Sequence, residues 1–287
     1  MSSGGHFYYQ QAENALSKFR LFGKENKWSE AAELFTKSGH SYKSVRDWIH
    51  AGESYHRASE CLANANKLDE AAIVASDAGK MFSKQSETSD RALQCYLESI
   101  RFYRENSKPI NAARLLNEAG KIFQEMDDTD KAISVYGEAA QIYDDENQSY
   151  SASVQLATVA DLLCSQKKFV EASDIYKNVA IRRINDRMTQ MSSGEYCTKS
   201  VVCRLAADDV VGAEMLLNEF VNLHPAWERS RECHLLTDCA AAVNNHDSGA
   251  FSQAVAEYDQ MRPLDRWMTN NLLIVKNLID DSEIDIL

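Results

Sequence analysis

The chain has 287 residues and carries 43 acidic against 31 basic side chains, which gives a net charge of −12. Hydrophobic residues make up 44% and charged residues 26%, as in ordinary folded proteins, while 3 prolines and 11 glycines are too few for a β-sandwich, a collagen or a long flexible linker. The acidic balance also excludes nucleic acid from the expected partners, because binding to phosphates needs clustered cations.

The amino-terminal residues 1–11 are polar and lack the apolar segment of a secretory signal. No run in the chain approaches the roughly 18 apolar residues of a membrane span. The seven cysteines include no Cys-x-x-Cys pair, so we expect reduced, packed thiols rather than disulfides or zinc ligands. These features are typical of a cytosolic protein.

Apolar and basic residues alternate in the segment 18–28, at the expected turn between the first two helices. Phe19, Leu21 and Phe22 stand there among four cations. One interpretation is a hydrophobic staple that closes the turn. The other is a small loop that touches a membrane, with its apolar side chains in the interface and its cations on anionic lipid.

Alanines recur at a spacing of forty residues along much of the chain, often with an aromatic residue four positions later. The two series are Ala32, Ala72 and Ala112, and Ala92, Ala132 and Ala172. Such a repeat predicts a solenoid of antiparallel helix pairs of about 40 residues each, in which small side chains let neighbouring helices approach closely. The tetratricopeptide repeat (TPR) has a period of about 34 residues, so we expect a relative of that design with longer helices.

The period loosens after Tyr176 and breaks at His224-Pro225. We therefore expect an all-α protein in which residues 1–223 form a right-handed superhelical, TPR-like solenoid of antiparallel helix pairs. Residues 224–287 would form a carboxy-terminal helical bundle, with the aromatic-rich segment 258–267 in its core. The repeat length predicts about 12–14 helices and no sheet of strands.

Motifs of catalysis are absent from the sequence. It contains no glycine-rich phosphate loop, no His-Glu-x-x-His and no Gly-x-Ser-x-Gly, and its histidines are scattered. We therefore expect no catalytic residue, no cofactor and no metal site. The last eight residues contain four acids and end on leucine, which alone would indicate an acidic tail that aids solubility.

Several short motifs together resemble the α-type soluble NSF attachment proteins. They are Leu21-Phe-Gly23, Trp48 with Ala51-Gly52, Pro225-Ala-Trp-Glu-Arg-Ser-Arg-Glu-Cys233, Glu257-Tyr-Asp259, Leu264-Asp-Arg-Trp267 and the acidic tail. Each is weak alone, but their order and spacing cover nearly the whole chain. The resemblance implies a non-enzymatic cytoplasmic adaptor, peripherally associated with membranes, that wraps around assembled SNARE complexes and recruits the hexameric ATPase NSF to disassemble them.

The resemblance also implies roles for individual residues. The cations that bind syntaxin-type, SNAP-25-type and synaptobrevin-type helices would be Lys84, Lys108, Arg114, Lys199 and Arg231. Contacts with an anionic membrane would come from Phe19, Leu21 and Phe22, and contacts with NSF from Asp280, Asp281, Glu283, Asp285 and Leu287. Val154 and Thr158 depart from the family, which tends to have lysines there, so a generic TPR-like scaffold without disassembly activity is the alternative interpretation.

Overall fold

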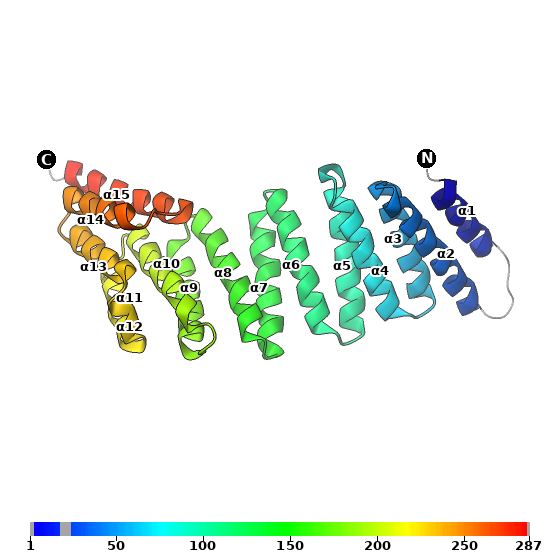
Figure 1. The fold of residues 1–287 in the computed structure, drawn as a ribbon, viewed down its shortest axis with the longest axis horizontal. Helices are drawn as coiled ribbons and strands as arrows, with labels where there is room; N and C mark the ends of the chain where they lie inside the picture. The colour runs from blue at the N-terminus through cyan, green and yellow to red at the C-terminus, as the bar shows by residue number, and fades with distance from the viewer. Residues whose placement is uncertain (1–2, 18–23, 286–287) are drawn as a thin grey trace. The chain divides into compact units, whose positions relative to one another are not determined.

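The computed structural model describes residues 3–17 and 24–285 and divides into two compact units, Met1–Gln148 and Ser149–Leu287. The described residues form fifteen α-helices, two short 3-10 helices and no strand (Figure 1). The all-α prediction is confirmed. The predicted count of 12–14 helices is too low, because a four-residue helix also forms at the His224-Pro225 break. The domain boundary expected between residues 223 and 224 lies inside the second unit and stays a prediction.

The first unit contains seven α-helices, each packed on the next in chain order. They are α1 (Ser3–Ser17), α2 (Lys24–Ser44), α3 (Trp48–Asn64), α4 (Leu68–Phe82), α5 (Ser89–Glu105), α6 (Pro109–Glu125) and α7 (Thr129–Asp145), with the 3-10 helix η1 (Ser86–Thr88) before α5. Short turns make consecutive helices antiparallel (Figure 1).

The second unit begins with helices of the same kind and ends with one that turns back. Its elements are α8 (Ser149–Ser165), α9 (Phe169–Asn185), η2 (Gln190–Ser192), α10 (Ser193–Ala206), α11 (Val210–Leu223), α12 (Pro225–Glu228), α13 (Arg231–Asn244), α14 (Ser248–Met261) and α15 (Arg266–Asp285). The last helix, α15, packs on α14 and also crosses α10, five elements earlier in the chain. This crossing ties the carboxy-terminal helices to the solenoid part of the unit.

The forty-residue alanine series marks the core, as predicted. All six of its members are at most 2% exposed. In α6 the apolar positions from Ala112 to Phe123 recur every three to four residues and are buried, so this helix presents one face to its neighbours and the opposite face to solvent. The repeat in the sequence is therefore a repeat of buried helix crossings.

An aromatic ring lies directly over a glycine of the preceding helix at four crossings of the first unit. The pairs are Gly39 with Tyr55, Gly52 with Phe82, Gly79 with Tyr96, and Gly120 with Tyr136. A Cβ atom on Gly79 would lie 2.8 Å from the Tyr96 ring, closer than atoms can pack. The Tyr136 hydroxyl also donates a 2.7 Å hydrogen bond to Gln124. Glycine is therefore needed at these positions because the ring occupies the space of a side chain.

Eight of the turns between helices share one backbone geometry. Each contains a residue with positive φ, and none of these residues is glycine: Arg46, Asn66, Ser107, Asp127, Asn147, Lys167, Asp208 and His246. The next residue donates its N–H to the carbonyl five positions earlier, as Lys108 does to Tyr103 at 2.8 Å. This is the Schellman arrangement, which satisfies the last carbonyls of a helix. Its recurrence about every 20 residues sets the length of each helix.

The seven cysteines are buried and none forms a disulfide, as the sequence predicts. Burial raises the pKa of Cys95 to about 12 and that of Cys61 to about 11, so these thiols stay protonated at neutral pH. They act as small apolar core residues.

No helix in the described part of the chain is both long enough and apolar enough to cross a membrane.

Replacing Gly79 with alanine should destabilise the protein by about 1–3 kcal/mol, because the new methyl group collides with the Tyr96 ring. Gly137 in α7 is the matched control, since nothing lies within 4 Å of a Cβ placed there. Gly137→Ala should stabilise the protein by up to about 1 kcal/mol through helix propensity. Chemical denaturation of both variants measures the difference, and equal effects would contradict the crossing geometry.

Candidate functional site

A groove on the first unit runs between α4 and α6, with Tyr103 of α5 in its lining. It encloses about 410 Å³ and carries Lys80 from α4 and Arg114 from α6. Arg114 is one of the five predicted cations, and it is exposed. Lys80 was not predicted from the sequence, although its position one helical turn before Lys84 would have placed both on one face.

Lys108 stands at the amino-terminal end of α6, just before Pro109. Its Nζ lies 2.7 Å from Oδ1 of Asp69 on α4, and both side chains are 44% exposed. The hydrogen bond from Lys108 lowers the pKa of the Asp69 carboxyl. Because water surrounds this pair, it is weak and can exchange for another carboxylate.

Lys84 lies in the turn that follows α4 and is exposed. Neither Lys84 nor Arg114 forms an ion pair with another described residue of the chain. The first unit therefore brings three of the predicted cations, with Lys80, to the side of α4 and α6 or to their ends.

The other predicted contact positions lie in the second unit. Arg231 is the first residue of α13, where it is exposed and forms no ion pair within the described ranges. Val154 and Thr158 lie one turn apart on α8, and the Thr158 hydroxyl donates to the Val154 carbonyl at 3.1 Å. Val154 is 36% exposed, so this part of α8 presents an apolar side chain to solvent.

Lys199 differs from the other predicted cations because its side chain is only 14% exposed. Its Nζ lies 3.1 Å from Asp161 of α8 and 3.5 Å from Glu195 of α10. Burial opposes the charge, but these two carboxylates outweigh that effect and raise the pKa of Lys199. The ammonium is thus fully charged and already paired inside the unit.

The predicted tail begins inside a helix. The backbone of α15 is helical as far as Asp285, and the Ser248 hydroxyl of α14 donates a short hydrogen bond to Asp280. The side chains of Asp281, Glu283 and Asp285 lie outside the described residues, as does Leu287. Phe19, Leu21 and Phe22 of the amino-terminal loop also lie outside them.

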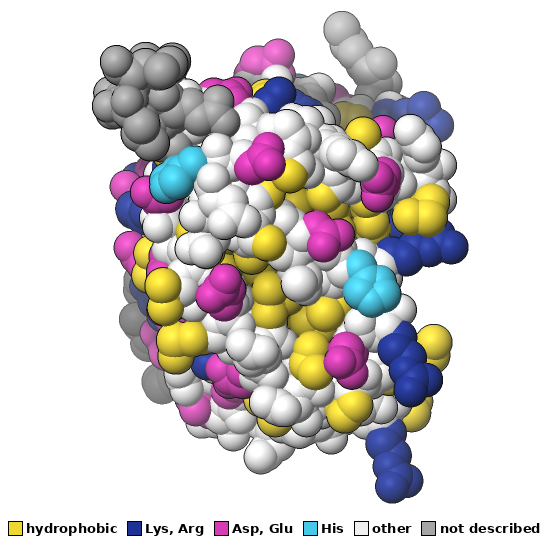
Figure 2. Space-filling view, turned by 90° about the vertical axis from the view of Figure 1, so that its left-hand side faces the viewer, with side chains coloured by type: hydrophobic (Ala, Val, Ile, Leu, Met, Phe, Trp, Pro, Cys, Tyr) yellow, Lys and Arg dark blue, Asp and Glu magenta, His cyan; other side chains and the backbone are white. Residues whose placement is uncertain are grey.

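Separate acidic side chains are exposed at the end of the molecule that carries the carboxy-terminal helices. On the face seen in Figure 2, Asp and Glu side chains are spread among apolar and neutral ones, while Lys and Arg side chains gather mainly toward one side.

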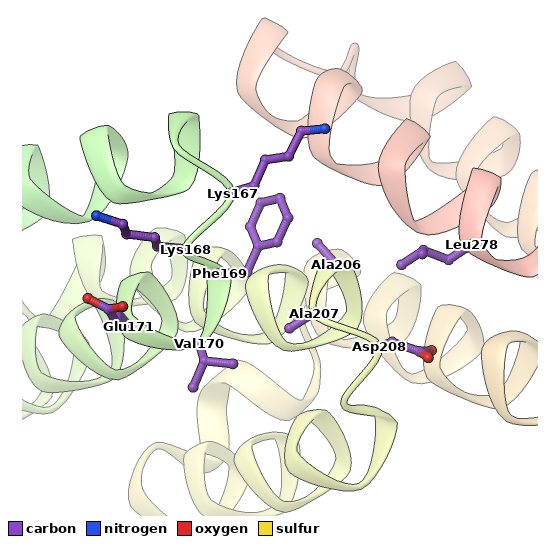
Figure 3. A pocket seen from close by; sticks show the side chains of 9 residues that line it. All are labelled: Lys167, Lys168, Phe169, Val170, Glu171, Ala206, Ala207, Asp208 and Leu278. Carbon is purple, nitrogen blue, oxygen red and sulfur yellow. The ribbon is translucent and has the colours of Figure 1, made fainter. Parts of the chain in front are cut away.

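A pocket of about 410 Å³ lies between α15 and two turns of the same unit. Figure 3 shows Lys167 and Phe169 on the α8–α9 side and Leu278 of α15 facing the α10–α11 turn. No group of three or more metal-ligating side chains occurs among the described residues.

Comparison with known proteins identifies relatives over almost the full length of the chain. The family model for the soluble NSF attachment protein, SNAP, matches residues 4–280. The alpha-soluble NSF attachment protein of Vitis vinifera is 28% identical over 281 residues, covering 98% of this chain and 96% of its own length. The protein of that name from Mus musculus is 28% identical over 279 residues, with 96% and 94% covered.

A probable vesicular-fusion protein of Schizosaccharomyces pombe is also 28% identical, over 270 residues, covering 93% of this chain and 92% of its own length. Among solved structures, a signal-transduction ATPase with a tetratricopeptide repeat sensor, from Pyrococcus horikoshii, aligns with a TM-score of 0.49 at 14% identity. That alignment covers 96% of this chain and 46% of the ATPase.

Proposed function

Because the chain belongs to the soluble NSF attachment protein family, we propose that it is a non-enzymatic adaptor that binds assembled SNARE complexes and recruits and stimulates the NSF ATPase. Two relatives are named for attachment to NSF and a third for vesicular fusion, which supports a role in vesicle fusion and membrane traffic. The observation that carries the proposal is the set of exposed cations on α4 and α6 in a chain of net charge −12.

The cations of the first unit suit a long acidic partner better than a small ligand. Lys108 stands just before α6 and Arg114 lies in its first half, while Lys80 lies in the last turn of α4 and Lys84 in the turn that follows. A four-helix SNARE bundle with an acidic outer surface offers carboxylates over a comparable length. Each exposed pair contributes only about 0.2–1 kcal/mol, so binding needs several pairs at once and several copies of the adaptor around one bundle.

At three helix ends, charged side chains have the sign that interacts unfavourably with the helix dipole. Lys108 and Arg231 stand at the amino-terminal ends of α6 and α13, where the helix dipole favours acids. Glu283 and Asp285 stand in the last turn of α15, where the dipole favours cations. Each such charge costs roughly 0.3–1 kcal/mol at low salt. Lys108 regains part of this cost through its ion pair with Asp69, whereas Arg231 has no ion pair within the described ranges, which supports the use of Arg231 in binding a partner.

The acidic carboxy-terminal segment is the proposed contact with NSF. Four like charges, Asp280, Asp281, Glu283 and Asp285, would repel one another and lose hydration if they were buried together. A basic surface of a partner would relieve that repulsion. Leu287 is proposed to add one apolar contact with a pocket of the ATPase.

The amino-terminal loop is the proposed contact with an anionic membrane, which would make the protein peripherally membrane-associated in the cytoplasm. Phe19, Leu21 and Phe22 are apolar and their neighbours are basic, the combination that suits the lipid interface. Insertion of these residues would concentrate the adaptor beside membrane-anchored SNARE complexes.

A scaffold without disassembly activity is the second candidate, and one observation favours it. The surface of α8 at Val154 and Thr158 lacks the cations expected there, so the basic face is interrupted. Such a chain would bind a partner but would not recruit NSF to disassemble it. The acidic segment that ends the chain favours the adaptor instead.

Reversing two exposed cations, Lys84→Glu with Arg114→Glu, should weaken binding of a purified SNARE complex at least about tenfold, because attraction becomes repulsion at two sites. The loss should shrink as salt is raised. The matched control reverses Arg101 and Lys131, which are 64% and 65% exposed and lie on α5 and α7. Titration calorimetry compares the two variants, and equal losses of affinity would contradict the proposed face.

Replacing Leu287 with alanine should leave SNARE binding unchanged and sharply reduce stimulation of ATP hydrolysis by NSF. The reduction is expected because Leu287 is the apolar contact proposed for the ATPase and plays no part in the proposed SNARE-binding face. The matched control is Leu273→Ala, because Leu273 is 55% exposed on the same helix. A chain that ends at Ile279 and still supports disassembly at the full rate would rule out the tail.

Replacing Phe19, Leu21 and Phe22 with serine should slow disassembly of membrane-anchored SNARE complexes far more than that of soluble ones, because membrane insertion raises only the local concentration. Met188→Ser with Met191→Ser is the control, since these side chains are 91% and 100% exposed elsewhere on the surface. An equal loss on both substrates would show that the loop closes the α1–α2 turn instead.

A further inference from the structure

Four helices of the second unit converge on the ammonium group of Lys199. The lysine projects from α10, and it meets Asp161 of α8 at 3.1 Å and Glu195 of its own helix at 3.5 Å. The Tyr176 hydroxyl of α9 donates a short hydrogen bond to the same Asp161 carboxylate. Tyr176 is fully buried and Lys199 is only 14% exposed, while Asp161 and Glu195 are 44% and 60% exposed, so the network runs from the core of the unit to its surface.

Two aromatic rings cover the remaining sides of this cation. The Lys199 Nζ lies 5.4 Å from the centre of the Tyr176 ring and 5.2 Å from that of Trp267. The two rings meet edge to face, with centroids 6.0 Å apart and an angle of 88°. Trp267 is the second residue of α15, so a cation of α10 holds the first turn of the last helix.

A second contact fixes the next turn of α15. Asn271 is buried and accepts a hydrogen bond from the Cys164 thiol of α8, with 3.3 Å between sulfur and oxygen. Its amide nitrogen donates to the Trp267 carbonyl at 2.8 Å. Further along, Leu278 faces the α10–α11 turn across the pocket of Figure 3. The start of α15 is therefore tied to α8, α9 and α10.

This anchor matters because α15 also carries the acidic segment. The helix is continuous from Trp267 to Asp285, which at 1.5 Å per residue is a distance of about 27 Å. The helix is also held further along, where Ile279 is buried and the Ser248 hydroxyl donates to Asp280, so a tilt of about 10° at its start would strain these contacts and displace its end by up to about 5 Å. A displacement of that size would break the hydrogen bonds and ion pairs that the end of the helix makes with a partner.

We propose that Lys199 is a positioning residue that fixes the start of α15 and thereby sets where the acidic segment meets the ATPase, and that it does not contact the SNARE bundle. The proposal rests on the function proposed above. A direct contact would require the ammonium to leave two carboxylates and two rings for a carboxylate of the partner. Lys84 and Arg114, in contrast, have no such internal partners among the described residues.

The test compares Lys199→Met, which keeps the length of the side chain and removes its charge, with Lys199→Arg and with Lys84→Met. For Lys199→Met we expect unchanged affinity for a SNARE complex, an unchanged dependence of that affinity on salt, and a fall of at least about fivefold in the maximal rate of ATP hydrolysis by NSF at saturating adaptor. Lys199→Arg should restore the rate, because a guanidinium keeps the charge and the ring contacts. Lys84→Met should instead lower affinity and its salt dependence.

Trp267→Leu removes the ring that contacts Lys199 and so tests the same interaction. It can replace Lys199→Met if that variant does not fold. Its defect in NSF stimulation should match that of Lys199→Met, and the double variant should be no worse than either, because both remove one interaction. Additive defects, or a Lys199→Met variant that loses SNARE affinity and salt dependence but keeps the full rate, would overturn the proposal.

Hydrogen exchange separates this proposal from the proposed function. Amides in the first turns of α15 should exchange at least about tenfold faster in Lys199→Met and in Trp267→Leu, but not in Lys199→Arg or Lys84→Met. This readout needs no partner. If the unaltered chain does not bind SNARE complexes, the proposed function is wrong, but the contact of Lys199 with the start of α15 is unaffected. If hydrogen exchange in α15 is the same in Lys199→Met as in the unaltered chain, Lys199 does not fix the start of α15, whatever the function of the protein.

Discussion

The close approach of neighbouring helices depends on an aromatic ring packed over a glycine. At Gly120 the Tyr136 ring occupies the place of a side chain, so the two backbones come as near as a ring's thickness permits. The alanines of the forty-residue series fill the rest of each crossing without separating the helices. Because this packing uses one face of each helix, the opposite face stays in solvent and is free to carry charge. The groove with Lys80 and Arg114 is built from such free faces.

The sequence predicted the parts of the fold that repeat. The alanine spacing predicted the buried positions of α6, because each repeat has a small residue at the equivalent position, where two helices cross. The turns could not be predicted in the same way, since their positive-φ residues include arginine, lysine and histidine and no glycine. Four of the eight are Asn or Asp, which adopt positive φ more readily than other residues. At Arg46 and Lys167 the conformation follows instead from the helices on either side and from the Schellman hydrogen bonds.

The candidate site was only partly predictable for a similar reason. Exposed cations such as Arg114 were predicted from the family resemblance, and Arg114 is indeed exposed and without an ion pair among the described residues. The surroundings of Lys199 could not be predicted, since they come from α8, α9 and α15, up to 68 residues away at Trp267. A linear motif gives the charge of a side chain but does not show whether that charge is already paired with other residues of the same chain. Lys108 is paired with Asp69 of α4, whereas Arg231 stands at a helix start that disfavours its charge and has no ion pair among the described residues.

The central claim is that one chain both holds a SNARE complex and activates an ATPase on it. The most direct measurement mixes the purified chain with a fluorescently labelled SNARE complex, NSF and ATP, and follows separation of the labelled helices over time. The account predicts rapid separation that requires the chain, NSF and ATP hydrolysis together. Binding of the SNARE complex without any acceleration of its disassembly would contradict the account and would favour a scaffold.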